Sequence, residues 1–78
     1  MEKKIAELRG AIYSNYPSEA ACARELGWPR QRLSKITNGE KEPNIEEIVS
    51  LARVLGKTVE DVVQIFLRHK SPNEQQSA

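Results

Sequence analysis

The chain has 78 residues, of which 38% are hydrophobic and 29% charged, and its formal net charge is only +1. This composition is typical of one ordinary globular domain and excludes a disordered or membrane-embedded chain. With so little net charge, any affinity for nucleic acid must come from where the cations lie and not from bulk basicity. A single cysteine and the lack of an apolar signal segment predict a chain that stays in the reducing cytoplasm.

An amphipathic helix is the first predicted element, and it ends ahead of Pro17. The residue before a proline avoids helical geometry, so the helix cannot continue past this point. Its apolar residues recur at spacings of three and four, which is the periodicity of one helical face. This stripe consists of Ile5, Leu8, Ala11, Ile12 and Tyr16.

Two short helices around a tight turn follow, and both have recognisable ends. Ser18 is a suitable cap for the first of them. Gly27 supplies the turn, because a residue without a Cβ adopts a left-handed backbone at little cost. Pro29 suits the first position of the next helix, and Asn38 with Gly39 closes that helix.

The two helices must also pack closely where they cross. Ala23 lies one helical turn before the bend and leaves room for a close approach, and Trp28 is expected to fill the wedge between the helices. The second helix carries Arg30, Arg32 and Lys35 without an acid. A steeply crossed pair with a basic second helix is the layout of a helix-turn-helix, which places that helix in the major groove of DNA.

Two more helices are predicted in the C-terminal half, each opened by a capping box. Asn44 with Glu47 opens the fourth helix, which ends at Gly56, and Thr58 with Asp61 opens the fifth. The buried face of the fifth helix is expected to consist of Val59, Val62, Val63 and Phe66. Residues 1–70 would then form one all-α domain, followed by a disordered tail at residues 71–78.

The fifth helix has further apolar residues beside this stripe. Ile65 and Leu67 lie on either side of it and widen the apolar arc beyond that of an ordinary surface helix. We therefore predict that Ile65 and Leu67 contact a second copy of the chain, since symmetric dimers are the commonest oligomers. The alternative is that both residues complete a small monomeric core.

Over residues 5–66 the chain resembles the lambda-repressor-like regulators, also called the Cro/CI or xenobiotic-response-element family. The residues that carry the resemblance are Leu8, Arg9, Ala23, Gly27, Asn38, Gly39, Pro43, Leu55 and Gly56. The resemblance implies a compact bundle of five helices that works as a homodimer. It also implies that the third helix enters the major groove of a two-fold symmetric, double-stranded DNA operator.

The resemblance further implies roles for single residues. Those expected to face the bases are Arg30, Gln31, Arg32, Ser34 and Lys35. Those expected to contact phosphates are Ser18, Asn38 and Lys41, which lie near helix ends. Arginine can bond bidentately to guanine and glutamine to adenine, so the chemistry of these residue types supports the first set.

Three positions depart from the family pattern. Many members have glutamine where this chain has Glu19, whose carboxylate a phosphate would repel unless the side chain turns away. Many also have glutamate in place of Thr37, and this glutamate pairs with the arginine of the first helix. Arg9 therefore lacks its usual partner, and the alternatives are the Thr37 hydroxyl, a helix carbonyl or water. Pro29 stands where serine or threonine is usual.

We interpret the chain as a non-enzymatic, sequence-specific DNA-binding regulator, most simply a repressor similar to the short phage Cro-type proteins. The alternative is an antitoxin of the same fold whose main task is to bind a toxin partner. The sequence contains no pattern typical of an activated nucleophile, a phosphate-cradling glycine loop or a cluster of metal ligands. We therefore expect no catalysis, metal or cofactor, and Cys22 is expected to be a small buried thiol.

Overall fold

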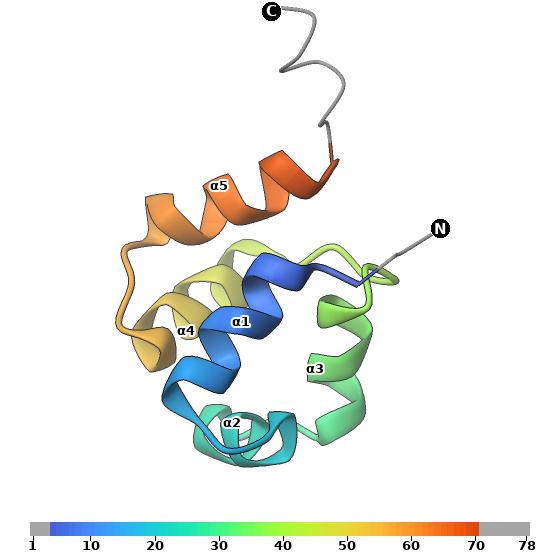
Figure 1. The fold of residues 1–78 in the computed structure, drawn as a ribbon, viewed down its shortest axis with the longest axis vertical. Coiled ribbons are helices and arrows are strands. Elements are labelled where there is room, and N and C mark those ends of the chain that lie inside the picture. The colour runs from blue at the N-terminus through green and yellow to red at the C-terminus, as the bar shows by residue number, and fades with distance from the viewer. Residues whose placement is uncertain (1–3, 71–78) are drawn as a thin grey trace, which may run out of the picture.

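The computed structural model describes residues 4–70, which fold into five helices. They are α1 (Ala6–Asn15), α2 (Glu19–Leu26), α3 (Arg30–Thr37), α4 (Ile45–Leu55) and α5 (Val59–Lys70). Figure 1 shows α1 crossing the middle of the bundle, α2 and α5 at its opposite ends and α3 along one side. The predicted all-α class is confirmed, whereas the tail predicted at 71–78 lies outside the described residues.

The predicted caps are present at the starts of three helices. Ser18 Oγ accepts a hydrogen bond of 3.1 Å from a backbone N–H in the first turn of α2. Asn44 and Glu47 form the capping box of α4 through reciprocal bonds of 2.8 and 2.9 Å. At α5, the backbone N–H of Asp61 donates to Thr58 Oγ1 at 3.0 Å. Each cap satisfies backbone donors that would otherwise lack partners, at a gain of about 1 kcal/mol.

The turn between α2 and α3 is built as the sequence predicts, with one shift of register. Gly27 has a φ of 77°, in the left-handed region that favours glycine. The next backbone N–H, of Trp28, donates to the carbonyl of Ala23 at 2.9 Å and closes the end of α2. Pro29 was predicted at the first helical position, but its ψ of 146° makes it the cap, and α3 begins at Arg30. The proline ring fixes φ alone, so it suits either position.

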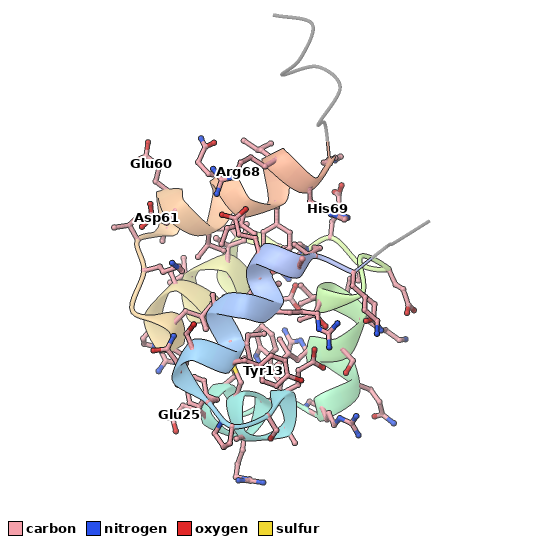
Figure 2. All side chains as sticks on the ribbon, in the orientation of Figure 1. Tyr13, Glu25, Glu60, Asp61, Arg68 and His69 are labelled. Atoms are coloured by element: carbon pink, nitrogen blue, oxygen red, sulfur yellow. The ribbon has the colours of Figure 1, made fainter. Side chains whose placement is uncertain are left out.

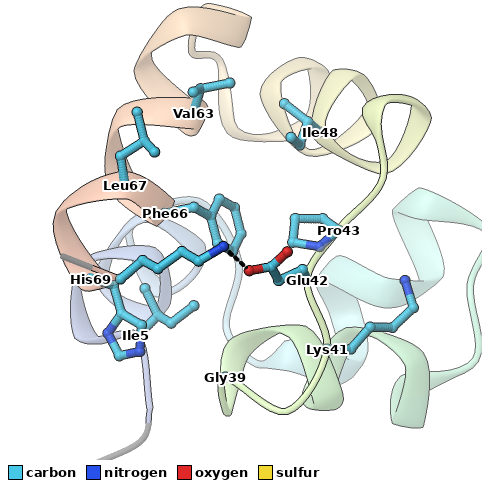
Figure 3. Close-up of a pocket in the computed structure, with 11 residues that line it drawn as sticks. Ile5, Gly39, Lys41, Glu42, Pro43, Ile48, Val63, Phe66, Leu67 and His69 are labelled. Atoms are coloured by element: carbon cyan, nitrogen blue, oxygen red, sulfur yellow. Dashed lines mark hydrogen bonds and ion pairs between the residues drawn. The ribbon is translucent and has the colours of Figure 1, made fainter.

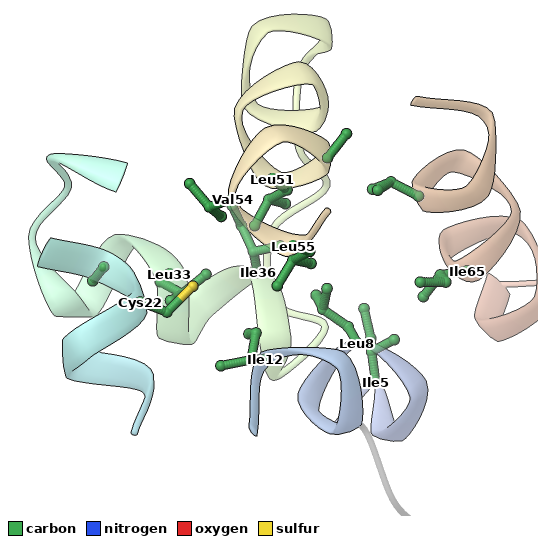
Figure 4. Close-up of a cluster of buried hydrophobic side chains, with 13 residues drawn as sticks. Ile5, Leu8, Ile12, Cys22, Leu33, Ile36, Leu51, Val54, Leu55 and Ile65 are labelled. Carbon is green, nitrogen blue, oxygen red and sulfur yellow. The ribbon is translucent and has the colours of Figure 1, made fainter. Parts of the chain in front are cut away.

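One continuous apolar core receives side chains from every helix (Figure 4). Its buried members are Ile5, Leu8, Ile12, Cys22, Ala23, Leu33, Ile36, Leu51, Ala52, Val54, Leu55, Val62 and Ile65. Because α1 packs against all four other helices, it joins the helix-turn-helix to the C-terminal pair. Burial and the nearby carboxylates of Glu19 and Glu25 raise the pKa of the Cys22 thiol to about 11. Cys22 is thus the buried, unreactive thiol that the sequence predicts.

The buried face of α5 differs from the predicted stripe. Ile65 is only 3% exposed and lies in the protein's own core, so almost none of its surface remains for a second copy of the chain. Conversely, Val59 is 43% and Leu67 48% exposed. The physical reason is that α5 is covered by α1 as well as α4, so its buried arc is rotated toward α1. For Ile65, the monomeric-core alternative is the correct one.

The charges at the two ends of α5 complement its dipole. Glu60 and Asp61 lie in the first turn, whereas Arg68 lies in the last (Figure 2). Arg68 also reaches α1, where its Nη2 lies 2.5 Å from an oxygen of Glu7. This exposed ion pair links the end of α5 to the start of α1.

Candidate nucleic-acid interface

The α3 helix has one buried face and one face that no other helix covers. Leu33 and Ile36 are fully buried on the inner side. Arg30, Gln31 and Lys35 are exposed. In Figure 1, α3 lies along the side of the bundle with its outer side open to solvent. Since its first turn contains no acid, the start of α3 combines positive side chains with the positive end of the helix dipole.

A polar hollow of about 350 Å³ borders this face, between α1, the start of α2 and α3. Four of the predicted contact residues line it, namely Ser18, Arg30, Ser34 and Asn38. Lys4 and Arg9 add cationic groups to the lining. The structure therefore brings together residues from both helices of the helix-turn-helix, as expected for a surface that follows a DNA backbone beside its groove.

The carboxylate of Glu19 lies in this hollow and is turned toward α3. Ser34 Oγ donates a hydrogen bond of 3.0 Å to one of its oxygens, and Thr37 Oγ1 donates one of 2.9 Å to the other. The Glu19 side chain is only 14% exposed. Glu19 is therefore turned toward α3 and links α2 to α3.

The same carboxylate lies near Arg9, which lacks the family's glutamate partner at position 37. Arg9 Nε lies 3.8 Å from a Glu19 oxygen, and the guanidinium is 5.9 Å from the centre of the Tyr13 ring. The nearest counter-charge of Arg9 is thus on α2, at ion-pair but not hydrogen-bond distance, and Arg9 Nε has no hydrogen-bond partner among the described residues. Thr37 donates its hydroxyl hydrogen to Glu19, so the residues at these two departures from the family pattern contact each other.

A second carboxylate, that of Glu47, lies on the opposite side of α3. It is 2% exposed and accepts hydrogen bonds from Arg32 Nε at 2.8 Å and from Lys41 Nζ at 2.6 Å, besides its bond to the Asn44 backbone. Burial alone would raise the pKa of Glu47. The hydrogen bonds from Lys41, the Asn44 backbone and Arg32 outweigh that effect and lower it to about 2.

The sequence explained Glu47 by its capping role alone and missed this cluster. A signal was present, because Glu47 shares the helical face of Leu51 and Leu55, both of which are buried. A carboxylate in such a stripe needs charged or hydrogen-bonding partners. The sequence could not tell which cations supply them.

Arg32 and Lys41 thus have intramolecular partners that their predicted roles did not include. The guanidinium of Arg32 is turned toward α4 and lies 4.5 Å from the centre of the Trp28 ring. It is therefore separated from Arg30 and Ser34, which line the hollow on the other side of α3. This position does not agree with the prediction that Arg32 faces the bases.

Comparison with known proteins agrees with this architecture. A family model described as Helix-turn-helix matches residues 18–62, from the cap of α2 into α5. No curated protein and no solved structure matches the chain significantly. Within residues 4–70, every helix is too short or too polar to cross a membrane. The chain belongs to the Helix-turn-helix family, as a lambda-repressor-like DNA-binding protein of the Cro/CI type.

Proposed function

We propose that the protein is a sequence-specific transcription regulator, most simply a repressor that occupies a palindromic operator. The observation that carries this proposal is the open face of α3, which presents Arg30, Gln31 and Lys35 beside a polar hollow. Such a helix fits the major groove, where each base pair offers a distinct pattern of donors and acceptors. A bound dimer would block access of RNA polymerase to overlapping promoter DNA.

Within this surface, Arg30 and Gln31 are the principal base-reading residues. Arginine suits guanine and glutamine suits adenine, and each good pair contributes about 1 to 3 kcal/mol of discrimination. Lys35 lies one turn after Gln31 and extends the same face. Ser34 donates its hydroxyl hydrogen to Glu19, so it keeps only oxygen lone pairs for a base.

On the α2 side, Ser18 and Asn38 are the proposed backbone contacts. Both line the hollow with Lys4 and Arg9. Ser18 Oγ already accepts the capping bond of α2, and its hydroxyl hydrogen can be donated to a phosphate oxygen. The positive end of the α2 dipole adds to this attraction.

For the homodimer we propose the outer side of α5 around Leu67. This residue borders an apolar hollow of about 280 Å³, to which Ile48, Val63 and Phe66 also contribute (Figure 3). A two-fold axis at α5 would join two copies while leaving both α3 helices free. Half-sites one DNA turn apart, about 34 Å, are then expected.

The test is selection of bound duplexes from a random library at two salt concentrations, which separates base reading from phosphate attraction. Recovery of a palindromic motif supports the dimeric regulator. No enrichment by a folded protein overturns it and favours the antitoxin role. Two apolar residues on α4 support the antitoxin role, because exposed apolar side chains suit contact with a protein partner. They are Ile45, which is 73% exposed, and Val49, which is 47% exposed.

A further inference from the structure

We propose that Arg32 and Lys41 together bind one phosphate of the DNA backbone, and that the buried carboxylate of Glu47 holds them in place for it. The inference rests on the proposed function, because it assumes that α3 enters the major groove. It assigns Arg32 to the backbone instead of the bases. It also makes Glu47 a positioning residue for DNA binding.

The first argument is the geometry of the cluster. Arg32 comes from α3 and Lys41 from the loop that follows it, yet both contact the two oxygens of a single carboxylate, at 2.8 and 2.6 Å. Their charged groups are therefore near enough to contact one anion together. Backbone hydrogen bonds from Glu40 and Lys41 to the Lys35 carbonyl also hold this loop against the end of α3.

The second argument is which donors remain available. Glu47 is 2% exposed, whereas the side chains of Arg32 and Lys41 are 42% and 40% exposed. The Glu47 carboxylate thus lies below the protein surface, and the two cationic side chains lie between it and the solvent. Among residues 4–70, Arg32 gives only Nε and Lys41 gives one hydrogen bond to protein acceptors. Several N–H donors and one net positive charge then remain on the outer side, which suits a phosphate.

The third argument is preorganisation. The Arg32 guanidinium lies over the Trp28 ring at 4.5 Å, and Glu47 is fixed by the backbone N–H of Asn44. Long cationic side chains lose rotamer freedom when they bind a phosphate. Here much of that entropy is already lost in the free protein, so less is lost on binding.

The fourth argument is the position of the cluster relative to the hollow. Ser18, Arg30 and Ser34 lie on the α2 side of α3, whereas Arg32 and Lys41 lie on its α4 side. A helix with its side chains is about 10 to 12 Å wide, and the major groove is about 12 Å wide. Groups on both sides of the helix can therefore contact the two phosphate backbones that border the groove.

The decisive experiment compares two charge-matched variants on the selected operator. Glu46 is an exposed neighbour of Glu47 in the first turn of α4. If only net charge mattered, Glu46→Gln and Glu47→Gln would both tighten binding, since each removes a negative charge near DNA. We expect Glu46→Gln to do so and Glu47→Gln to weaken binding by about tenfold. Equal tightening by both variants overturns the inference.

A second measurement does not depend on removing Glu47. Glutamine at positions 32 and 41 keeps a donor for the buried carboxylate but removes the cation. If Arg32 and Lys41 share one phosphate, Arg32→Gln/Lys41→Gln reduces the slope of log K against log salt by about 0.9, the value for one phosphate. A reduction of about twice that value means two separate contacts and contradicts the shared site.

Base preference provides the remaining control. Arg32→Gln should lower the affinity equally for all DNA sequences. A change of the preferred base at one operator position would show that Arg32 contacts a base and would contradict the inference. Thermal unfolding of each variant verifies that it is folded at the binding temperature. If the wild-type protein itself selects no motif, the proposed function fails. If it selects one and Glu47→Gln behaves like Glu46→Gln, only this inference fails.

Discussion

Two carboxylates flank α3, and they hold it by different means. Glu19, on the α2 side, accepts hydrogen bonds from the neutral hydroxyls of Ser34 and Thr37. Glu47, on the α4 side, is more deeply buried and binds two cations. Uncharged hydroxyl donors link helices through Glu19, whose cationic neighbour Arg9 lies 3.8 Å away. Cationic donors link them and also set the electrostatics of the surface.

The largest expected effect comes from removing the more buried carboxylate. Glu47→Ala should reduce the free energy of unfolding by about 3 kcal/mol, because it removes the Glu47 half of the α4 capping box and the acceptor of two charged donors. Denaturation by urea measures the change, with Glu46→Ala as the matched variant on the same turn. A loss no larger than that of Glu46→Ala would show that the cluster contributes nothing to stability.

The pH dependence of stability should report on the Glu47 carboxylate. The pKa of Glu47 falls from an ordinary 4.5 to about 2 on folding. Its contribution is therefore complete above pH 4.5 and is lost as the pH falls toward 2. Urea midpoints recorded across this range should fall less steeply in Glu47→Gln than in the wild type. Parallel curves for the two proteins would contradict the lowered pKa.

A smaller effect is expected on the α2 side. Glu19→Ala should reduce the free energy of unfolding by about 1 to 2 kcal/mol, less than Glu47→Ala, since the donors to Glu19 are uncharged hydroxyls and Arg9 lies beyond hydrogen-bond distance. Thr37 Oγ1 can still donate to the carbonyl of Ser34, at 3.1 Å, which limits the loss. The double variant Glu19→Ala/Thr37→Val should recover part of it, because the fully buried hydroxyl is then gone. If Thr37→Val instead adds a further loss, the hydroxyl has another role.

The smallest effect is expected for a carboxylate that is not buried. Glu7 pairs with Arg68 between α1 and α5, and their side chains are 51% and 44% exposed. Glu7→Gln should change the urea midpoint less than either Glu19→Ala or Glu47→Ala, because solvent screens exposed pairs. This variant gives the baseline against which the two flanking carboxylates are compared. A larger change than that of Glu19→Ala would reverse the expected order.

The local features of the fold were predictable because short segments determine them. Ser18, Gly27 and the Asn44–Glu47 box act within four residues, and the structure contains all of them. The inward turn of Ile65 was not predictable, since it depends on how α1 packs against α5. Helical periodicity gives the width of an apolar face but not which neighbour covers it.

In the candidate site, too, some features could be predicted from the sequence and others depend on how the helices pack. The exposure of Arg30 and Gln31 follows from their place on α3, and the sequence predicted it. The partners of Glu19 and Glu47 on α3 lie 15 to 18 residues away along the chain. No helical period relates such positions, so only the packed structure identifies these pairs.

Finally, the stacking of Arg32 on Trp28 equips the protein with an internal optical probe. Trp28 is the single tryptophan of the chain, and its ring lies 4.5 Å from the guanidinium that we assign to the DNA backbone. Any displacement of that guanidinium alters the environment of the indole. The intrinsic emission of the unlabelled protein can therefore report, during a DNA titration, whether Arg32 stays in place.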